Sequence, residues 1–498
     1  MAKIKIDIER QIGKVDKLIY GSNVVQLGRC TYGGIWDEKQ NTFNKEVINA
    51  VKQQGVSMLR GPDANLASSY KWEEGIKEKG SRKRINKRLW TNINSEEFGT
   101  NEFIEFCRLV NAEPYIVLNM CDGSLEEAQS WIEYCNSNED LFYPNKRKDF
   151  GYNDPFKVKY WGLGNEVYGK WNIGYLNKEE YIKKVYDFCK ILKGVDQSIK
   201  LIASGYMIDR ANLLLWDAPI LEALYDQIDF IGLHIYLDNI ENDYYKYMSK
   251  AVVIEEIIKV TKNNIENIKL VKNKKRDVYI NIDEWNVFYR AITPEVAEFL
   301  FKDNYNVKLS KDAFSLEEEY NLEDALIIGM FLNSFIRNAD IVKMANMAQL
   351  VNVVGPIFTS KNDILLQSIF YPFSLYASQN GDISIDSFID CESFSVDGED
   401  FPILDISTTF DSKTKKIVLN VINKHLTQDI STEIINLSGN ILRDYKVYEI
   451  NSENIKDTNT IKKKDKIKII ENNFSNGSNK FKFIFPFHSI SSIVLQLQ

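Results

Sequence analysis

The feature that most constrains the fold is a regular alternation of short apolar runs with segments of helical spacing. Pro114–Met120 (PYIVLNM) and Asp229–Tyr236 (DFIGLHIY) are clear examples of the apolar runs. Amphipathic segments such as Lys178–Leu192 lie between them. The predicted strands are Leu18–Val25, Val56–Arg60, Pro114–Met120, Lys159–Tyr168, Lys200–Gly205, Asp229–Tyr236, Val278–Trp285 and Ile341–Gln349. This alternation predicts a parallel sheet with right-handed crossovers.

Eight such units that close on themselves form a (β/α)8 barrel, the TIM barrel. A doubly wound open sheet is the alternative fold for the same alternation. That fold commonly carries a glycine-rich phosphate loop after an early strand, and no such loop follows the early strands of this chain. The sequence therefore favours the closed barrel.

The pattern changes after about Tyr371, where helical spacing stops and short alternating strands separated by turn residues take over. Such a pattern is typical of a β-sandwich, here expected to be jelly-roll-like. The isolated strand Lys3–Ile8 (KIKIDI) has no place in the barrel, so we expect it to pair with the sandwich. The predicted domains are residues 1–17, the N-terminal strand; 18–372, the barrel; and 373–498, the sandwich.

Two glutamates stand at the tips of predicted strands. Glu166 ends the run KYWGLGNEVY, and Glu284 ends the run VYINIDEW. The carboxyl ends of barrel strands converge on one face, where active sites lie. Because a carboxylate at the tip of a buried strand contributes nothing to packing, these two point to chemistry. Two carboxylates are the minimum equipment for acid/base work on a glycosidic bond.

Further polar residues fall at the same strand ends. They are Arg60, Asn119, Asn165, His234, Tyr236, Asn346 and Gln349. Each one alone has a structural explanation, since a single histidine in an apolar strand is usually a satisfied core residue. Their joint position on one rim favours a functional site. Because side chains alternate along a strand, His234 and Tyr236 share a face, and we expect them to reach Glu166 and Glu284, respectively.

The spacing of the two carboxyl groups decides the chemistry. If they lie roughly 5–5.5 Å apart, one acts as a nucleophile and the anomeric configuration is retained. Neighbouring carboxylates raise one another's proton affinity, so one stays protonated as the acid while the other is ionised. Asn165, beside the acid, is expected to hydrogen-bond a sugar hydroxyl.

Composition excludes several other classes of function. The net charge is −8, and the basic run Ser81–Arg88 (SRKRINKR) is interpreted as a solvated loop, so no nucleic-acid partner is expected. The N-terminus has no apolar leader and no window would span a membrane, which predicts a cytoplasmic protein. Six scattered cysteines indicate reduced thiols. Three histidines without a ligand motif indicate no metal centre.

Five short motifs carry a family resemblance. They are LGRCTYGGI at Leu27–Ile35, GLGNE at Gly162–Glu166, LHIY at Leu233–Tyr236, DEWN at Asp283–Asn286 and AQLVNV at Ala348–Val353. They resemble the α-L-arabinofuranosidases of glycoside hydrolase family 51. The resemblance runs almost continuously from about Tyr20 to Pro372 and implies a barrel joined to a sandwich that includes the N-terminal strand.

The resemblance also implies roles for individual residues. Glu166 matches the family's acid/base and Glu284 its nucleophile. The residues that match the glycone pocket are Arg60, Asn65, Asn165, His234, Tyr236 and Gln349. The implied activity is an exo-acting, retaining α-L-arabinofuranosidase that uses no cofactor and takes arabinose-containing oligosaccharides. The family is usually intracellular in bacteria and forms homo-oligomers, commonly hexamers.

The chain departs from the family pattern at the glycone pocket. Val25 and Gln26 stand where the family has Glu-His, and Asp63 and Ala64 stand in a turn where it has two glycines. Phe288 replaces a tryptophan. We expect Asp63 to face the pocket and Phe288 to line it. The alternatives are a retaining hydrolase for another furanoside, a β-xyloside or a β-glucan, and a catalytically weak carbohydrate-binding protein.

Overall fold

The computed structural model describes residues 2–82, 85–87, 92–94, 96–207, 213–302, 307–310, 313–361 and 363–498. The basic run 81–88 lies partly outside these residues. The loop prediction is wrong for part of the run, because Ile85–Lys87 forms strand β7, which pairs with β8 (Asn92–Asn94). No helix in the described part of the chain is long and apolar enough to cross a membrane.

The central element is a closed barrel of parallel strands in the order β10-β11-β12-β13-β14-β3-β6-β9. The strands are β3 (Gly21–Asn23), β6 (Met58–Gly61), β9 (Glu113–Val117), β10 (Tyr160–Leu163), β11 (Lys200–Met207), β12 (Phe230–Leu237), β13 (Tyr279–Val287) and β14 (Val342–Met347). The predicted (β/α)8 barrel is therefore confirmed. The first strand is shorter than predicted, because Lys17–Tyr20 forms the 3₁₀-helix η1, which Asp16 caps.

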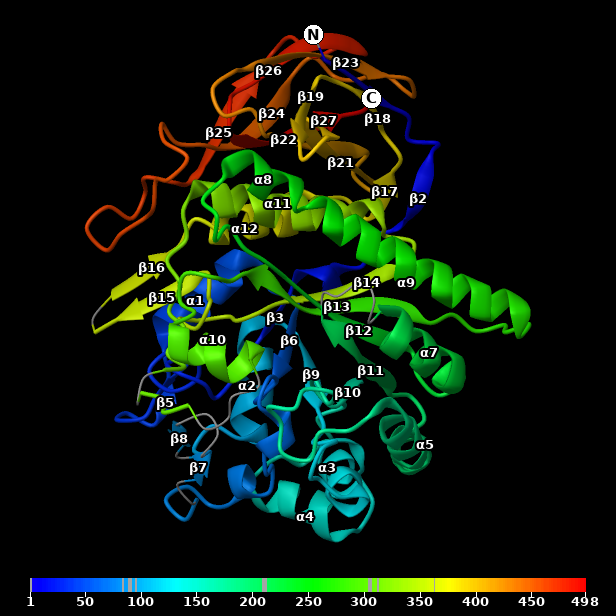
Figure 1. The fold of residues 1–498 in the computed structure, drawn as a ribbon, viewed down its shortest axis with the longest axis vertical. Coiled ribbons are helices and arrows are strands. Elements are labelled where there is room, and N and C mark those ends of the chain that lie inside the picture. The colour runs from blue at the N-terminus through cyan, green and yellow to red at the C-terminus, as the bar shows by residue number, and fades with distance from the viewer. Residues whose placement is uncertain are drawn as a thin grey trace.

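Helices follow the barrel strands and surround the barrel in Figure 1. They are α1 (Lys45–Gln54), α2 (Thr100–Val110), α3 (Leu125–Asn136), α4 (Phe142–Asp149), α5 (Lys178–Val195), the π-helical η5 (Leu213–Asp217), α7 (Ala218–Leu224), α8 (Tyr244–Ser249), α9 (Val252–Val271), α10 (Pro294–Phe301), α11 (Leu322–Arg337) and α12 (Phe370–Gln379). Several of these helices begin at a capping residue. Asn44 and Ser124 cap the N-termini of α1 and α3, and Asn177 forms a capping box with Glu180 at the start of α5. The single helix predicted over Tyr247–Asn267 is wrong, since α8 ends at Ser249 and α9 begins at Val252.

Helix α11 is buried on all sides because it lies between the barrel and the sandwich. Gly329 permits this close packing, since a Cβ there would come within 2.8 Å of Ile422 in the sandwich. Asn333 and Arg337, further along the helix, both bond the carboxylate of Asp405. The apolar composition of this helix is thus explained by two partners rather than one.

The sandwich lies at one end of the molecule and contains both chain termini (Figure 1). One sheet has the order β18-β1-β23-β26, and the other has the order β2-β17-β21-β22-β27-β24-β25. The strands are β1 (Ala2–Ile6), β2 (Gln11–Lys14), β17 (Ile383–Ile385), β18 (Phe388–Asp390), β21 (Leu404–Asp411), β22 (Lys416–Asn423), β23 (Ile430–Asn436), β24 (Tyr445–Ile450), β25 (Ile469–Phe474), β26 (Lys480–Phe485) and β27 (Ser489–Gln496). Apolar residues of both sheets, among them Ile4 and Ile493, share one core.

Short two-stranded sheets decorate this frame: β4 (Trp36–Asp37) with β5 (Thr42–Phe43), β15 (Ile357–Ser360) with β16 (Asp363–Leu366), and β19 (Ser393–Val396) with β20 (Glu399–Pro402). The predicted pairing of the N-terminal strand with the sandwich is confirmed, because β1 pairs in parallel with β23 and antiparallel with β18. Helical structure continues beyond Tyr371, contrary to expectation, since α12 ends at Gln379. The limit at residue 372 falls inside α12, and the domain boundaries stay a prediction.

Candidate active site

The turn after β10 delivers Glu166 to the barrel rim. Gly164 has φ +88°, and a Cβ there would lie 2.4 Å from Val167 Cγ1 and 3.0 Å from Met120 Cβ. Only glycine fits both the backbone conformation and the space. The strand can therefore end and turn sharply, which places Asn165 and Glu166 directly above the barrel.

Glu166 itself has φ 43°, a left-handed conformation that side-chain-bearing residues rarely adopt. Two donors hold its carbonyl oxygen in this position: the Gly169 N–H at 2.8 Å and Asn172 Nδ2 at 2.9 Å. Strained backbone of this kind clusters at functional sites, where the surrounding structure over-determines it. The backbone of Glu166 is thus fixed by the fold of its own loop.

A bulge in β13 brings two successive acidic residues to one cation. Gly232 of β12 pairs with Asn281 of β13, and the next pair is His234 with Glu284. Strand β13 therefore has one more residue than β12 between these two pairs. Such a bulge re-aims the side chains that follow it. Arg60 contacts both acids: Nη1 lies 3.0 Å from Glu284 Oε1, and Nη2 lies 3.4 Å from Asp283 Oδ2.

The carboxylate of Glu284 accepts hydrogen bonds from three side chains. Arg60 donates to Oε1 at 3.0 Å, while Asn65 Nδ2 and the Tyr236 hydroxyl both donate to Oε2 at 2.9 Å. The residue is only 2% exposed. An ionised carboxylate is purely an acceptor, so this set of donors orients it and supports its charge.

His234 connects the two glutamates. Its Nδ1 lies 2.9 Å from Glu166 Oε1 and 3.6 Å from Glu284 Oε2, and its Nε2 lies 3.3 Å from Asp283 Oδ1. One oxygen of each glutamate and the ring nitrogen all lie within 4.8 Å of one another. The two carboxyl groups are therefore close neighbours, which favours the retaining spacing over the roughly 6.5–9.5 Å of inverting enzymes.

Amide side chains extend the same network. Asn165 accepts from Arg60 Nη2 at 2.6 Å and donates to the Asn65 carbonyl at 3.3 Å. Gln349 Nε2 donates to Asn65 Oδ1 at 2.9 Å. The structure thus brings together all eight residues that the resemblance implied: Arg60, Asn65, Asn165, Glu166, His234, Tyr236, Glu284 and Gln349. Their individual roles stay predictions.

The positions where the chain departs from the family pattern have structural partners. Asp63 Oδ1 accepts from the Gln26 backbone N–H at 2.8 Å, so this oxygen holds the loop after β3. Val25 and Ala64 are fully buried. The Phe288 ring packs edge-on against Tyr236, with ring centroids 6.0 Å apart. The binding roles of Asp63 and Phe288 stay predictions.

Two of the rim residues lie outside this hydrogen-bond network. Asn119 donates to Asp122 and accepts from the Cys121 N–H, so it stabilises the turn after β9. Asn346 is fully buried in β14 beside Gly21, where an added Cβ would lie 2.5 Å from the amide nitrogen. Neither has a described bond to Glu166 or Glu284.

Asp283 also belongs to this network, although the sequence pattern did not predict it. It is buried, and it contacts Arg60, His234 and the Tyr115 hydroxyl, which donates to Oδ2 at 3.3 Å. Strict alternation would direct Asp283 away from a site that holds Glu284. Only the bulge allows both to face it, and the residues DEW carry no signal for a bulge.

Burial and charge act together on the acidic groups. Burial raises the pKa of Asp283, but Arg60 and His234 outweigh this and hold it below its usual range. Burial raises the pKa of Glu284, and Glu166 raises it further against the effect of His234 and Arg60. Burial lowers the pKa of His234, but the charges of Glu284 and Asp283 bring it well above its ordinary value. Three carboxylates thus face two cations, and one additional proton balances the site.

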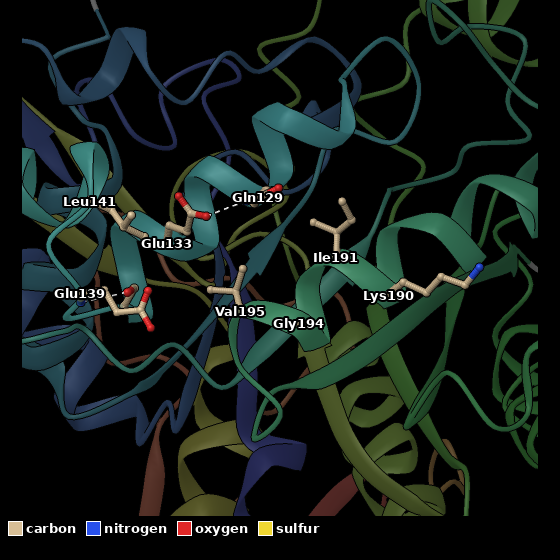
Figure 2. A pocket seen from close by; sticks show the side chains of 9 residues that line it. Gln129, Glu133, Glu139, Leu141, Lys190, Ile191, Gly194 and Val195 are labelled. Atoms are coloured by element: carbon tan, nitrogen blue, oxygen red, sulfur yellow. Dashed lines mark hydrogen bonds between the residues drawn. The ribbon is translucent and has the colours of Figure 1, made fainter.

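A surface groove lies elsewhere, between α3 and α5, with a volume of about 460 Å³. Figure 2 shows its mixed lining, in which the apolar Leu141, Ile191 and Val195 stand beside polar residues such as Gln129, which donates to Glu133 at 2.7 Å. Neither glutamate of the network described above is among its lining residues. This groove is therefore separate from the network at the barrel rim.

Comparisons with known proteins agree with this geometry. Residues 50–252 match the α-L-arabinofuranosidase 1 domain, and residues 283–489 match the α-L-arabinofuranosidase C-terminal domain. An intracellular exo-α-(1→5)-L-arabinofuranosidase of Halalkalibacterium halodurans is 33% identical over 92% of this chain and 92% of its own. α-L-Arabinofuranosidase C of Emericella nidulans is 31% identical over 98% of this chain and 96% of its own.

The fold comparison covers the whole molecule. The crystal structure of the Thermotoga maritima α-L-arabinofuranosidase in complex with arabinose covers 100% of both chains, with a TM-score of 0.89 and 30% identity. A family 51 enzyme from Thermotoga petrophila has a TM-score of 0.88 and 30% identity, over 99% of this chain and 100% of its own. On sequence and structure together, the chain belongs to the α-L-arabinofuranosidases of glycoside hydrolase family 51.

Proposed function

We propose that this chain is an exo-acting, retaining α-L-arabinofuranosidase that releases terminal α-L-arabinofuranosyl residues from arabinose-containing oligosaccharides. The observation that carries the proposal is the close pair of carboxyl groups, Glu166 and Glu284, in one buried network with a shared histidine. The names of the relatives, including an exo-α-(1→5)-L-arabinofuranosidase, support the substrate and the exo mode of action.

The proposed reaction has two displacements. Glu166 donates its proton to the glycosidic oxygen while Glu284 attacks the anomeric carbon, so the aglycone leaves as an alcohol and a glycosyl ester forms on Glu284. Glu166, now ionised, takes a proton from water, and the resulting hydroxide equivalent attacks the anomeric carbon and frees Glu284. Two inversions at one carbon retain its configuration.

The neighbouring residues have separate tasks in this mechanism. Arg60, Asn65 and Tyr236 hold the Glu284 carboxylate in line, because all three donate to it. His234 positions Glu166 through the 2.9 Å contact. Sugar hydroxyls would bond the amides of Asn165 and Gln349, and Asp63 and Phe288 would complete the wall of the glycone pocket.

A panel of nitrophenyl glycosides tests the substrate. Turnover is expected on the α-L-arabinofuranoside, with much slower turnover on the β-D-xyloside and β-D-glucoside. Proton NMR of the first-formed sugar should show the α-anomer, as retention requires. Inactivity on the arabinofuranoside with turnover of another glycoside would support the hydrolase with a different glycone specificity. Inactivity on every substrate would support the carbohydrate-binding protein.

The acid side of the pH profile should report Glu284. Its carboxyl must be ionised to attack, and burial raises its pKa. Activity is therefore lost as the pH falls through this raised pKa, so the acid limb of kcat/KM should lie above the pKa of an ordinary glutamate. A kcat/KM profile from pH 3 to 9 checks this. An acid limb at or below the ordinary value would contradict the assignment.

The cellular setting follows as part of the same proposal. We propose a cytoplasmic location, since several relatives carry "intracellular" in their names. By family resemblance we also propose a homo-oligomer, a hexamer, which light scattering coupled to size-exclusion chromatography would measure. The two carboxyl groups supply the whole reaction, so the enzyme would need no cofactor.

A further inference from the structure

Three potential metal donors converge at the barrel rim, from the loop after β10 and from strands β12 and β13. They are Glu166 Oε1, His234 Nδ1 and Glu284 Oε2, and such donor atoms of the three residues lie within 4.8 Å of one another. We propose that this Glu166–His234–Glu284 cluster binds one divalent transition-metal ion, with zinc as the best fit, and that the bound ion blocks the site.

The spacing of the donors suits a small ion. Zinc binds nitrogen and carboxylate oxygen at about 2.0–2.2 Å, so two ligands at a tetrahedral angle lie about 3.4 Å apart. Here His234 Nδ1 lies 2.9 Å from the Glu166 oxygen and 3.6 Å from the Glu284 oxygen. Displacements of a few tenths of an ångström around the imidazole would bring these two pairs to ligand geometry.

The contact on the other ring nitrogen of His234, Nε2, is a second, independent indication of a metal site. His234 Nε2 lies 3.3 Å from Asp283 Oδ1, and Asp283 is itself held by Arg60 and Tyr115. A carboxylate behind the ligating histidine is the usual arrangement at zinc sites, because it sets the tautomer and the direction of the ring. The ring is thus already aimed with Nδ1 toward the two glutamates.

The chemistry of the donors selects the class of ion. One imidazole with two carboxylates suits zinc, copper and nickel, whereas calcium requires six or more oxygen ligands. Charge points the same way. If the ion displaces the proton of His234 and the additional proton of the carboxylates, then Glu166, Glu284 and Asp283 against Arg60 leave two net negative charges, which a divalent ion balances.

Such an ion would inhibit the enzyme. It would hold one carboxyl oxygen of Glu166, the proposed proton donor, and one of Glu284, the proposed nucleophile. Substrate and metal would therefore exclude one another. The competition between them rests on the proposed function, whereas binding of the ion itself does not.

Calorimetric titration of the tag-free protein with zinc chloride tests the site directly. We expect one zinc ion per chain for the wild type and at least tenfold weaker binding for His234→Gln. The chain has only three histidines, and His425→Gln is the matched control. His425 lies in the sandwich, where its Nδ1 accepts from the backbone of Thr427 and Gln428, so this variant should bind zinc like the wild type.

The remaining outcomes are equally decisive. Glu166→Gln, whose side chain is partly exposed at 16%, should also weaken binding and covers the case in which His234→Gln fails to fold. Zinc should raise KM for nitrophenyl α-L-arabinofuranoside without changing kcat, EDTA should reverse the effect, and magnesium should have none. No zinc binding, binding that survives both variants, or binding lost only in His425→Gln would overturn the proposal. Zinc binding at the cluster in a protein inactive on arabinofuranosides would refute the proposed function alone.

Discussion

Replacing Glu284 by alanine should reduce turnover of every substrate by at least about 10⁴-fold, because the covalent path disappears with its nucleophile. Neither other carboxylate of the site is expected to substitute. Glu166 is the proposed acid, and Asp283 is turned toward Arg60, Tyr115 and Nε2 of His234. Steady-state kinetics on an activated nitrophenyl arabinofuranoside would measure the loss.

The same variant offers a stereochemical control. Removal of the side chain leaves space beside the anomeric carbon, so added azide should attack from that side and restore turnover. A single displacement inverts configuration, and the azide product should be the β-anomer. Glu241→Ala serves as the matched control, since that side chain is 58% exposed and bonds only to Lys246 among its described contacts. Near wild-type activity without azide would contradict the nucleophile assignment.

The barrel could be predicted because burial sets a periodicity that the sequence carries directly. Runs such as Asp229–Tyr236 are covered on both faces, and β12 occupies almost the same residues. The predicted limits of helices were wrong where the spacing of apolar residues does not mark the end of a helix. The apolar spacing continues through Lys250, yet α8 ends and α9 begins there, and Tyr371 stands at the start of a helix rather than at its end.

The site was predictable where residues act from the ends of regular strands, as Arg60, His234 and Tyr236 do. It was not predictable where irregular backbone decides the direction of a side chain. Asp283 reaches the site only through the bulge in β13. Asp63 is the opposite case. It was expected to face the pocket, but one of its carboxylate oxygens accepts a hydrogen bond from the backbone N–H of Gln26.

Replacing Glu166 by alanine should affect substrates unequally. The sugar aglycone of an unactivated oligosaccharide is a poor leaving group unless its oxygen is protonated. Turnover of such a substrate should therefore fall by about 10²–10⁴-fold, the usual contribution of a general acid. A dinitrophenyl arabinofuranoside has a stable leaving anion and needs no proton. Its glycosylation step should be nearly unchanged, and a burst of dinitrophenol should appear, because the second step lacks its base.

The burst separates the acid role from a structural one. If Glu166 merely supported the loop after β10, its loss would slow good and poor leaving groups alike, and no intermediate would accumulate. Its position argues for the acid, since its carboxyl is held by His234 beside the nucleophile while the loop is held separately, through the Glu166 carbonyl. Because azide can also attack the accumulated glycosyl ester, it should accelerate this variant with retention of configuration. The same anion would therefore give opposite anomers in the Glu166 and Glu284 variants, an outcome that only a double displacement with these two roles produces.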